Sequence, residues 1–132
     1  MVAGIGIDIL DVARMERELA REGHGMRDEV FTDGEVARGA RSGRPARHLA
    51  ACFAAKEALF KALGTGWSQG LAWREVELAE VGPRGELVLS GRTREVAFRL
   101  GVRRAWASTS HCGELAIASV VLETGEQSHQ ME

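Results

Sequence analysis

The pattern of hydrophobic and polar positions predicts one long, nearly buried helix in the middle of the chain. Residues 45–63 read PARHLAACFAAKEALFKAL. At 3.6 residues per turn, most of the large apolar side chains fall on one face, and alanines fill much of the remaining circumference. Pro45 suits the first turn of such a helix, and Gly64 suits the residue that ends it. A helix with so few polar positions is expected to lie inside the protein.

Residues 2–10 follow the two-residue period of a β-strand. One face of this strand is made of isoleucines, and the other carries two glycines followed by an aspartate. Glycine weakens a strand, and the usual compensation is that a ligand or another backbone approaches closely. The aspartate either projects over this glycine-lined face or serves as a turn residue at the strand end. The alternating positions are Ile5, Ile7 and Ile9 on one face and Gly4, Gly6 and Asp8 on the other.

Two shorter helices are predicted before the long one. Asp11 can cap a helix over residues 12–21. Thr32 and Glu35 have the spacing of a capping box, which predicts a second helix over residues 33–40.

Beyond residue 66 the pattern is that of strands with one further helix. The predicted elements are a hairpin of residues 76–78 and 87–89, a helix from Ser90 or Thr93 to Leu100, and two strands over residues 104–108 and 115–122 joined by a turn over residues 109–114. Residues 124–132 are polar and are expected to form a frayed tail. The elements predict a single α+β domain over residues 1–123, with a sheet packed on the long helix.

The composition restricts the class of protein and the kinds of partner. With 132 residues, of which 45% are hydrophobic, the chain suffices for one domain with a sizeable core. The formal net charge of −2 favours neither nucleic acid nor an anionic membrane, and no apolar run approaches the roughly 18 residues of a membrane span. Cys52 and Cys112 lack the spacing of a disulfide framework or a zinc site, so both are expected to be reduced in a cytoplasmic protein.

Three charged side chains interrupt the otherwise apolar central helix. Glu57 and Lys61 are one turn apart, and Lys56 flanks the other side of the apolar stripe. One interpretation is a simple Glu57–Lys61 pair that stabilises the helix slightly. Three ionisable groups followed by the glycine-rich residues 64–66 favour a second interpretation, a site that handles an anion.

Two groups of arginines lie near the predicted helices. They are Arg14, Arg17 and Arg21 on the first helix and Arg41, Arg44 and Arg47 around the start of the central helix. The first group recurs at helical spacing and forms one basic stripe. Such a stripe is either a solvated face or a docking site for an acidic partner.

His111 is the histidine with the most suggestive neighbours. In the predicted turn it follows Ser108, Thr109 and Ser110. A lone histidine in a turn is usually incidental, but one beside hydroxyls and backbone amides can donate to a phosphate. The other histidines, with no comparable neighbours, are His24, His48 and His129.

Three separated segments resemble one family. They are Gly4-Ile5-Gly6-Ile7-Asp8-Ile9 with Arg14, then Phe53-Ala54-Ala55-Lys56-Glu57-Ala58 with Lys61-Ala62 and Gly64-Thr65-Gly66, and finally Ser108-Thr109-Ser110-His111. Their order and spacing over residues 2–123 resemble the 4′-phosphopantetheinyl transferases of the small holo-acyl-carrier-protein synthase type.

This resemblance implies a fold and a reaction. The fold is the 4′-phosphopantetheinyl transferase fold, an antiparallel-rich sheet packed on a long central helix, and family members of this size form trimers with the site between subunits. The reaction moves the 4′-phosphopantetheine group of coenzyme A to a serine of an apo acyl carrier protein and leaves adenosine 3′,5′-bisphosphate. It depends on Mg²⁺, and the carrier serves fatty acid or polyketide synthesis.

The resemblance also implies roles for individual residues. Asp8 and Glu57 bind Mg²⁺, and Lys61 contacts the pyrophosphate or assists the leaving group. The base that removes the serine proton stays open between Glu57, Asp8 and a metal-bound water. The implied coenzyme A contacts are Lys61, Gly64, Thr65, Gly66, Thr109, Ser110 and His111, and the implied carrier contacts are Arg14 and Arg21, with Arg17 on the same stripe.

One position departs from the family pattern. The family usually has an arginine immediately before Phe53, associated with binding a phosphate of coenzyme A, and this chain has Cys52 there. Arg44 or Arg47 is expected to replace that contact. By its position in the buried helix, Cys52 is most simply a small core side chain. The alternative function is a catalytically weak homologue that binds coenzyme A or the carrier protein.

Overall fold

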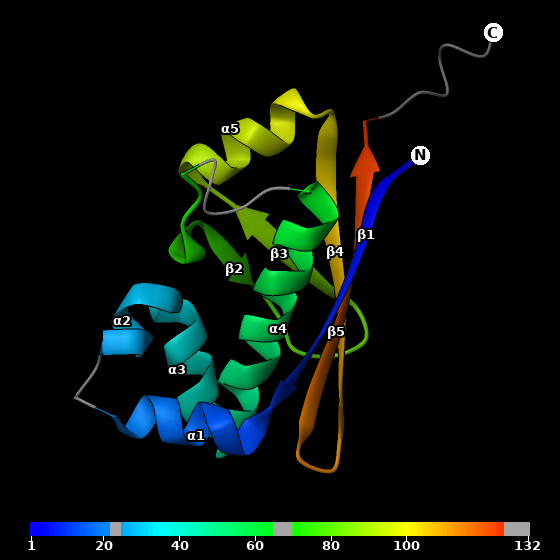
Figure 1. The fold of residues 1–132 in the computed structure, drawn as a ribbon. Coiled ribbons are helices and arrows are strands. Elements are labelled where there is room, and N and C mark those ends of the chain that lie inside the picture. The colour runs from blue at the N-terminus through cyan, green and yellow to red at the C-terminus, as the bar shows by residue number, and fades with distance from the viewer. Residues whose placement is uncertain (22–24, 65–69, 126–132) are drawn as a thin grey trace, which may run out of the picture.

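The computed structural model describes residues 1–21, 25–64 and 70–125 (Figure 1). Its elements in chain order are β1 (Val2–Asp11), α1 (Val12–Ala20), α2 (Gly25–Val30), α3 (Asp33–Ser42), α4 (Pro45–Leu63), the 3₁₀ turn η2 (Trp73–Glu75), β2 (Val76–Leu78), β3 (Gly85–Leu89), α5 (Gly91–Arg99), β4 (Val102–Cys112) and β5 (Leu115–Thr124). The predicted tail beyond residue 125 lies outside the described residues.

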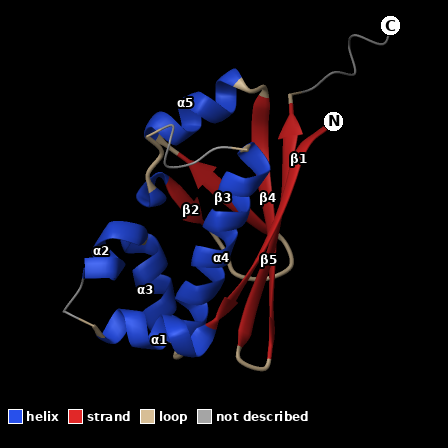
Figure 2. Cartoon of the chain, viewed as in Figure 1, coloured by secondary structure: helices blue, strands red, loops and turns tan. Residues whose placement is uncertain are grey.

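The strands form a five-stranded antiparallel sheet in the order β1-β5-β4-β3-β2. Strands β4 and β5 pair along most of their length, whereas β3 pairs with β4 only through Gly85↔Ala107 and Glu86↔Trp106. Figure 2 shows the helices on one side of the strands, with α4 lying along them. The predicted α+β fold, a sheet packed on a long central helix, is confirmed.

Strand β1 approaches α4 closely through its two glycines. A Cβ atom at Gly4 would lie 2.5 Å from the carbonyl oxygen of Ala62, and one at Gly6 would overlap the carbonyl oxygen of Ala58. Of the two compensations predicted for these glycines, the structure therefore shows the approach of another backbone. Because Asp8 follows on the same face of β1, its carboxylate reaches the side of α4.

The opposite face of the sheet carries exposed apolar side chains. Ile5, Ile7 and Ile9 of β1 are 70%, 59% and 57% exposed, and Trp106 and Leu115 are also exposed. Within the described residues, no helix covers this face (Figure 1). A single chain therefore leaves a band of large apolar side chains in water, which is typical of an interaction surface.

Several predicted boundaries are confirmed by their caps. The Asp11 side chain accepts a hydrogen bond from the backbone of Ala13 at the start of α1, and Thr32 and Glu35 form both bonds of the capping box of α3. Helix α4 begins at Pro45, and Gly64 ends it in the left-handed conformation with φ 74°.

The predicted turn over residues 109–114 is wrong. Residues 109–112 continue β4 and pair with β5, from Thr109↔Ala118 to Cys112↔Leu115, so His111 lies in a strand. The polar run 108–111 has the composition of a loop, but pairing with the apolar strand β5 extends the ladder through it. Helix α2 was also not predicted, since its six residues are too few to show a helical period.

Within the described part of the chain, no helix has both the length and the hydrophobicity needed to cross a lipid bilayer.

Candidate active site

Asp8 on β1 and two side chains of α4 meet at the edge of the β1–α4 contact. The ammonium of Lys61 lies 2.6 Å from Oδ1 of Asp8 and donates a second hydrogen bond to the carbonyl oxygen of Ile7, at 3.3 Å. Glu57, one turn before Lys61, hydrogen-bonds the Asp8 carboxyl group. The structure thus brings together the three residues predicted to be catalytic, and the close approach of β1 at Gly6 makes this possible.

The two carboxyl groups share this site at an electrostatic cost. Burial, the negative charge of Asp8 and the hydrogen bond that protonated Glu57 donates to the Asp8 carboxylate together raise the pKa of Glu57 to about 7, while Lys61 and Arg14 act in the opposite direction. The hydrogen bond to Asp8 raises the pKa of Lys61. A carboxyl pair of which one member holds its proton near neutrality has a strong tendency to take up a cation.

The basic stripe of α1 starts next to this carboxyl pair. Arg14 is close enough to Glu57 to lower its pKa, and Arg14, Arg17 and Arg21 are all exposed. Arg21 forms an ion pair with Glu18 at 3.0 Å, with both side chains substantially exposed. The stripe is therefore placed to present a partner to the carboxyl pair.

Lys56, the third charge of the central helix, belongs to the core and not to this site. Its side chain is fully buried, and its Nζ lies 2.8 Å from Oε1 of Glu35, which is fully buried as well. The ammonium also donates to the carbonyl oxygens of Val30 and Trp73, at 2.8 and 3.0 Å. The interpretation that all three charges of the helix serve one anion site is wrong for Lys56, because its three polar partners come from the core.

A second group of candidate residues lies near the start of α4. Nε2 of His111 is 3.2 Å from the carbonyl oxygen of Arg47. A cavity of about 240 Å³ lies at this group and is lined by Ser42, Arg44, Arg47, His48, Val81 and His111. The Arg44, Arg47 and His111 side chains that were predicted to contact the nucleotide are therefore neighbours in space.

His48 is the residue of this group that sequence reasoning missed. Burial, the charge of Arg38 and the proximity of His111 lower the pKa of His48, and its Nε2 is buried with no hydrogen-bond partner among the described residues. The sequence places no comparable neighbours beside His48, and only the fold brings it next to His111. The available signal was its position one helical turn after Arg44. His24 and His129 lie outside the described residues.

The other residues predicted to contact coenzyme A do not gather in one place. Thr109 is 93% buried, accepts a hydrogen bond from the backbone N–H of Gly82 and donates to its carbonyl oxygen, while Ser110 is exposed on the other face of β4. Gly64 ends α4 three residues after Lys61 and is exposed. Thr65 and Gly66 lie outside the described residues. Their roles in binding a ligand stay predictions.

Cys52 is fully buried, and its surroundings agree with a core side chain. Burial raises the pKa of its thiol, and Glu35, Lys56 and Arg38 are among the charged groups that act on it. Both cysteines are unpaired. An arginine at position 52 would thus place a cation beside Lys56 in the core of this chain.

The two groups of candidate residues are well separated in a single chain. Arg47 and Glu57 are both on α4, ten positions apart, which corresponds to about 15 Å of helix. Within the described ranges, no three His, Cys, Asp or Glu side chains converge as a ready-made metal site. The Asp8–Glu57 pair offers two carboxylates, which leaves the remaining positions around a cation to a substrate and to water.

The sequence of this chain matches a family model over residues 4–119, that of the 4′-phosphopantetheinyl transferase superfamily. It is 40% identical over 124 residues to the holo-[acyl-carrier-protein] synthase of Koribacter versatilis, an alignment that covers 93% of this chain and 99% of that protein.

Solved structures show the same likeness in the fold. The holo-[acyl-carrier-protein] synthase of Neisseria meningitidis superposes with a TM-score of 0.82 at 28% identity, covering 94% of this chain and 100% of the other. The Helicobacter pylori holo-[acyl-carrier-protein] synthase in complex with coenzyme A superposes with a TM-score of 0.76 at 28% identity, covering 90% and 99%.

Proposed function

Because this chain belongs to the 4′-phosphopantetheinyl transferase superfamily, we propose that it transfers the 4′-phosphopantetheine group of coenzyme A to a serine of an apo acyl carrier protein. The other product is adenosine 3′,5′-bisphosphate. The observation that carries the proposal is the Asp8–Glu57–Lys61 group, which lies inside the matched region and combines two carboxyl groups with a cation.

Asp8 and Glu57 fit a Mg²⁺ site. Mg²⁺ prefers oxygen ligands and is commonly held by one or two carboxylates together with substrate phosphates. Two carboxyl groups in hydrogen-bond contact supply such ligands, and the raised pKa of Glu57 reflects the repulsion that a cation would relieve. When bound, Mg²⁺ would offset the negative charge that develops on the pyrophosphate during transfer.

The side chains of this group then divide the work of the transfer. Lys61 holds a positive charge at the site, where it can bind a phosphate oxygen of coenzyme A and stabilise the leaving group. The base that removes the serine proton stays open between Glu57, Asp8 and a metal-bound water, since a bound cation would lower the pKa of a carboxyl group that ligates it. Asp8 orients Lys61 through their contact at 2.6 Å.

The acidic carrier protein is proposed to dock on the basic stripe of α1. Arg14 begins that stripe beside Glu57, so a partner bound there would present its serine to the carboxyl pair. Charge reversal of Arg17 to Glu is expected to raise the KM for the carrier several-fold and to leave the KM for coenzyme A unchanged. Equal changes in the two KM values would contradict this docking site.

A homotrimer is proposed to complete the site. The exposed isoleucines of β1 need a covering surface, and the group around His111 lies about 15 Å along α4 from Glu57 in the same chain. If one protomer supplies Asp8 and its neighbour supplies Arg44 and His111, both groups can bind one coenzyme A.

Mixed assemblies test the shared site. Asp8→Ala and His111→Ala variants are each expected to be impaired, and unfolding and refolding them together should restore activity, because some sites then combine two intact groups. No restoration in mixed trimers would place each site within one chain. Sedimentation of Ile5→Arg, at a position 70% exposed in the single chain, should show loss of the trimer.

Mass spectrometry of the carrier protein tests the transfer itself. The enzyme, coenzyme A and Mg²⁺ should add one phosphopantetheine group to an apo carrier, and Asp8→Asn and Glu57→Gln should each abolish the addition while keeping the melting temperature. No addition to any authentic carrier would favour the alternative of a homologue that only binds coenzyme A or the carrier. Full activity of either variant would contradict the assigned roles. The cytoplasmic location stays a prediction.

A further inference from the structure

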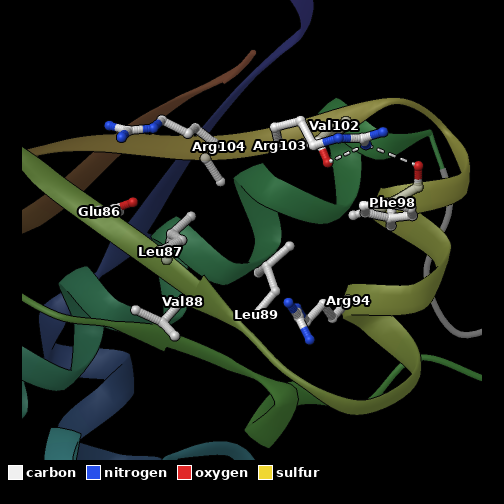
Figure 3. A pocket seen from close by; sticks show the side chains of 11 residues that line it. Glu86, Leu87, Val88, Leu89, Arg94, Phe98, Val102, Arg103 and Arg104 are labelled. Atoms are coloured by element: carbon white, nitrogen blue, oxygen red, sulfur yellow. Dashed lines mark hydrogen bonds between the residues drawn. The ribbon is translucent and has the colours of Figure 1, made fainter. Parts of the chain in front are cut away.

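A cavity lies where β3 and β4 separate (Figure 3). The strands pair only at Gly85↔Ala107 and Glu86↔Trp106, and beyond these pairs α5 closes one side of the gap. The cavity has a volume of about 280 Å³, close to the lower end of the roughly 300–1,000 Å³ typical of small-molecule sites. The strand from Ala105, on its lining, to His111 spans about 20 Å, so this cavity is separate from the group around His111. Its lining also includes none of Asp8, Glu57 and Lys61.

Seven of the eleven residues that line this cavity are apolar, and they come from three elements. Leu87 of β3, Ala97 of α5 and Val102 and Ala105 of β4 line it and are themselves buried. Phe98 of α5 stands at the rim and is 59% exposed. A small apolar group that entered here would be enclosed by the hydrophobic core on one side and by Phe98 on the other.

Three arginines and one glutamate surround these apolar walls. Arg94, Arg103 and Arg104 face a single acidic lining residue, Glu86, in a chain whose formal net charge is −2. The cavity therefore has a local excess of positive charge, although the chain as a whole is slightly negative, and it is suited to an anion.

The arginines differ in how firmly they are held. The guanidinium of Arg103 lies 3.9 Å from the ring centroid of Phe98 and donates to the carbonyl oxygens of Phe98 and Val102, at 3.1 and 3.2 Å. Arg94 makes no hydrogen bond or ion pair with its side chain in the described part of the molecule. Figure 3 shows the Arg94 side chain beside Leu89 at the cavity. Arg94 is thus a cation next to an apolar wall and available to a ligand.

A second, more open cavity adjoins the first across α5. It has a volume of about 600 Å³ and is lined by Gly91, Arg94, Glu95, Phe98 and Arg99. Because Arg94 and Phe98 line both cavities, a ligand held by the Arg94 guanidinium can place its apolar part in the enclosed cavity and its polar part at the open one.

We propose that this cavity binds a small amphipathic anion, a molecule with a carboxylate or phosphate head group and one short apolar chain. The chain lies against Leu87, Ala97 and Val102, and the head group binds Arg94, since a guanidinium forms strong paired hydrogen bonds with both kinds of anion. This binding site goes beyond the transfer reaction and does not depend on it.

Binding of octanoate and octyl phosphate to the full chain in its native assembly tests the proposal. Titration followed by protein NMR should show saturable binding of one molecule per chain below the concentration at which the probe forms micelles. The shifted amides should belong to residues 87–89, 94–98 and 102–105. The tighter of the two probes identifies the head group, and octan-1-ol, with the same chain and no charge, should bind at least about tenfold more weakly.

Two variants of α5 form a matched pair for this test. Arg94→Gln removes the proposed contact at an exposed position and should weaken octanoate binding about tenfold or more. Arg99→Gln removes an equal charge from the same helix, at a residue that lines only the open cavity, and should leave the affinity within about twofold.

The proposal is overturned if neither anion saturates the protein, if octan-1-ol binds as tightly as octanoate, or if the two variants weaken binding equally. It is also overturned if the shifted amides lie elsewhere, or if a neighbouring protomer occupies the cavity in the native assembly. Each of these measurements is made without coenzyme A and carrier protein, so failure of the transfer reaction would not affect them.

Discussion

Replacing Lys56 by methionine is expected to destabilise the fold by about 3–5 kcal/mol. Nζ of Lys56 and Oε1 of Glu35 are 2.8 Å apart, and both side chains are fully buried. Methionine keeps an unbranched side chain of similar length and removes the charge, so the Glu35 carboxylate is left unpaired in the core. The carbonyl oxygens of Val30 and Trp73 lose their hydrogen bonds from the ammonium as well.

The remaining contacts of Glu35 limit this cost. Its carboxylate still accepts hydrogen bonds from the backbone N–H groups of Thr32 and Leu78, at 3.0 and 2.8 Å. The loss should therefore stay within the range measured for breaking a buried ion pair, far below the full cost of burying an isolated ion. Because unfolding free energies are typically about 5–15 kcal/mol, the melting temperature should fall by roughly 10–20 °C.

Urea unfolding at a fixed protein concentration measures the effect, and Lys61→Met is the matched control. The control makes the same chemical change on the same helix, but the Lys61 side chain is 58% exposed in its pair with Asp8, so water replaces the contact. A Lys56→Met loss no larger than that of the control, with an unchanged dependence on urea, would refute the role of the buried pair.

A double variant separates the ion pair from the hydrogen bonds around it. In Lys56→Met combined with Glu35→Gln, the amide keeps an acceptor for one backbone N–H and no charge remains unpaired, so a large part of the lost stability should return. If the double variant is as unstable as the sum of the two single variants, the backbone contacts of Glu35 and not its charge hold this part of the core.

Four further predictions concern α4 and its contact with β1. Gly6→Ala places a Cβ against the backbone of α4 and should lower the free energy of unfolding, measured with urea, by about 3 kcal/mol or more. Gly25→Ala is the control, because position 25 has open space around it and the change should alter stability little. An equal loss in both variants would contradict the packing argument. Because the pKa of Glu57 is raised to about 7, the folded metal-free chain binds more protons than the unfolded chain between pH 4.5 and about 7. The free energy of unfolding should therefore decline as pH rises through that window. This decline should be absent in Glu57→Gln. For the same reason Mn²⁺ affinity, measured by electron paramagnetic resonance, should rise roughly tenfold from pH 6 to pH 8, and a flat profile would contradict the assignment. Lys61→Ala should tighten metal binding without coenzyme A, because its ammonium occupies Oδ1 of Asp8, while Lys61→Arg should not.

Much of the secondary structure was predictable because its signals are local. The capping box at Thr32 and Glu35, Pro45 at the start of α4 and Gly64 at its end each act within a few residues. The turn predicted at residues 109–114 failed for the opposite reason. Its polar residues are strand only because β5, the next segment of the chain, pairs with them.

In the candidate site, too, contacts that depend on local spacing were predictable and contacts between distant segments were not. The i,i+4 spacing of Glu57 and Lys61 predicted that the two side chains share a face of α4, and the glycines of β1 predicted a close approach beside Asp8. The proximity of His48 to His111 depends on how β4 lies against the start of α4, since no sequence spacing relates residues so far apart.

The sequence alone determined the α+β fold and the long apolar helix, because hydrophobic period and caps are properties of neighbouring residues. Its resemblance to a family, carried by separated motifs, predicted the three residues Asp8, Glu57 and Lys61. Only the tertiary structure decided which charge of α4 serves which purpose. Lys56 and Lys61 are alike in sequence and both stand within one turn of Glu57. Packing seals Lys56 against Glu35 in the core and leaves Lys61 at the surface beside Asp8. The physical reason is that burial decides the cost of a charge, and burial depends on elements that are distant in the chain.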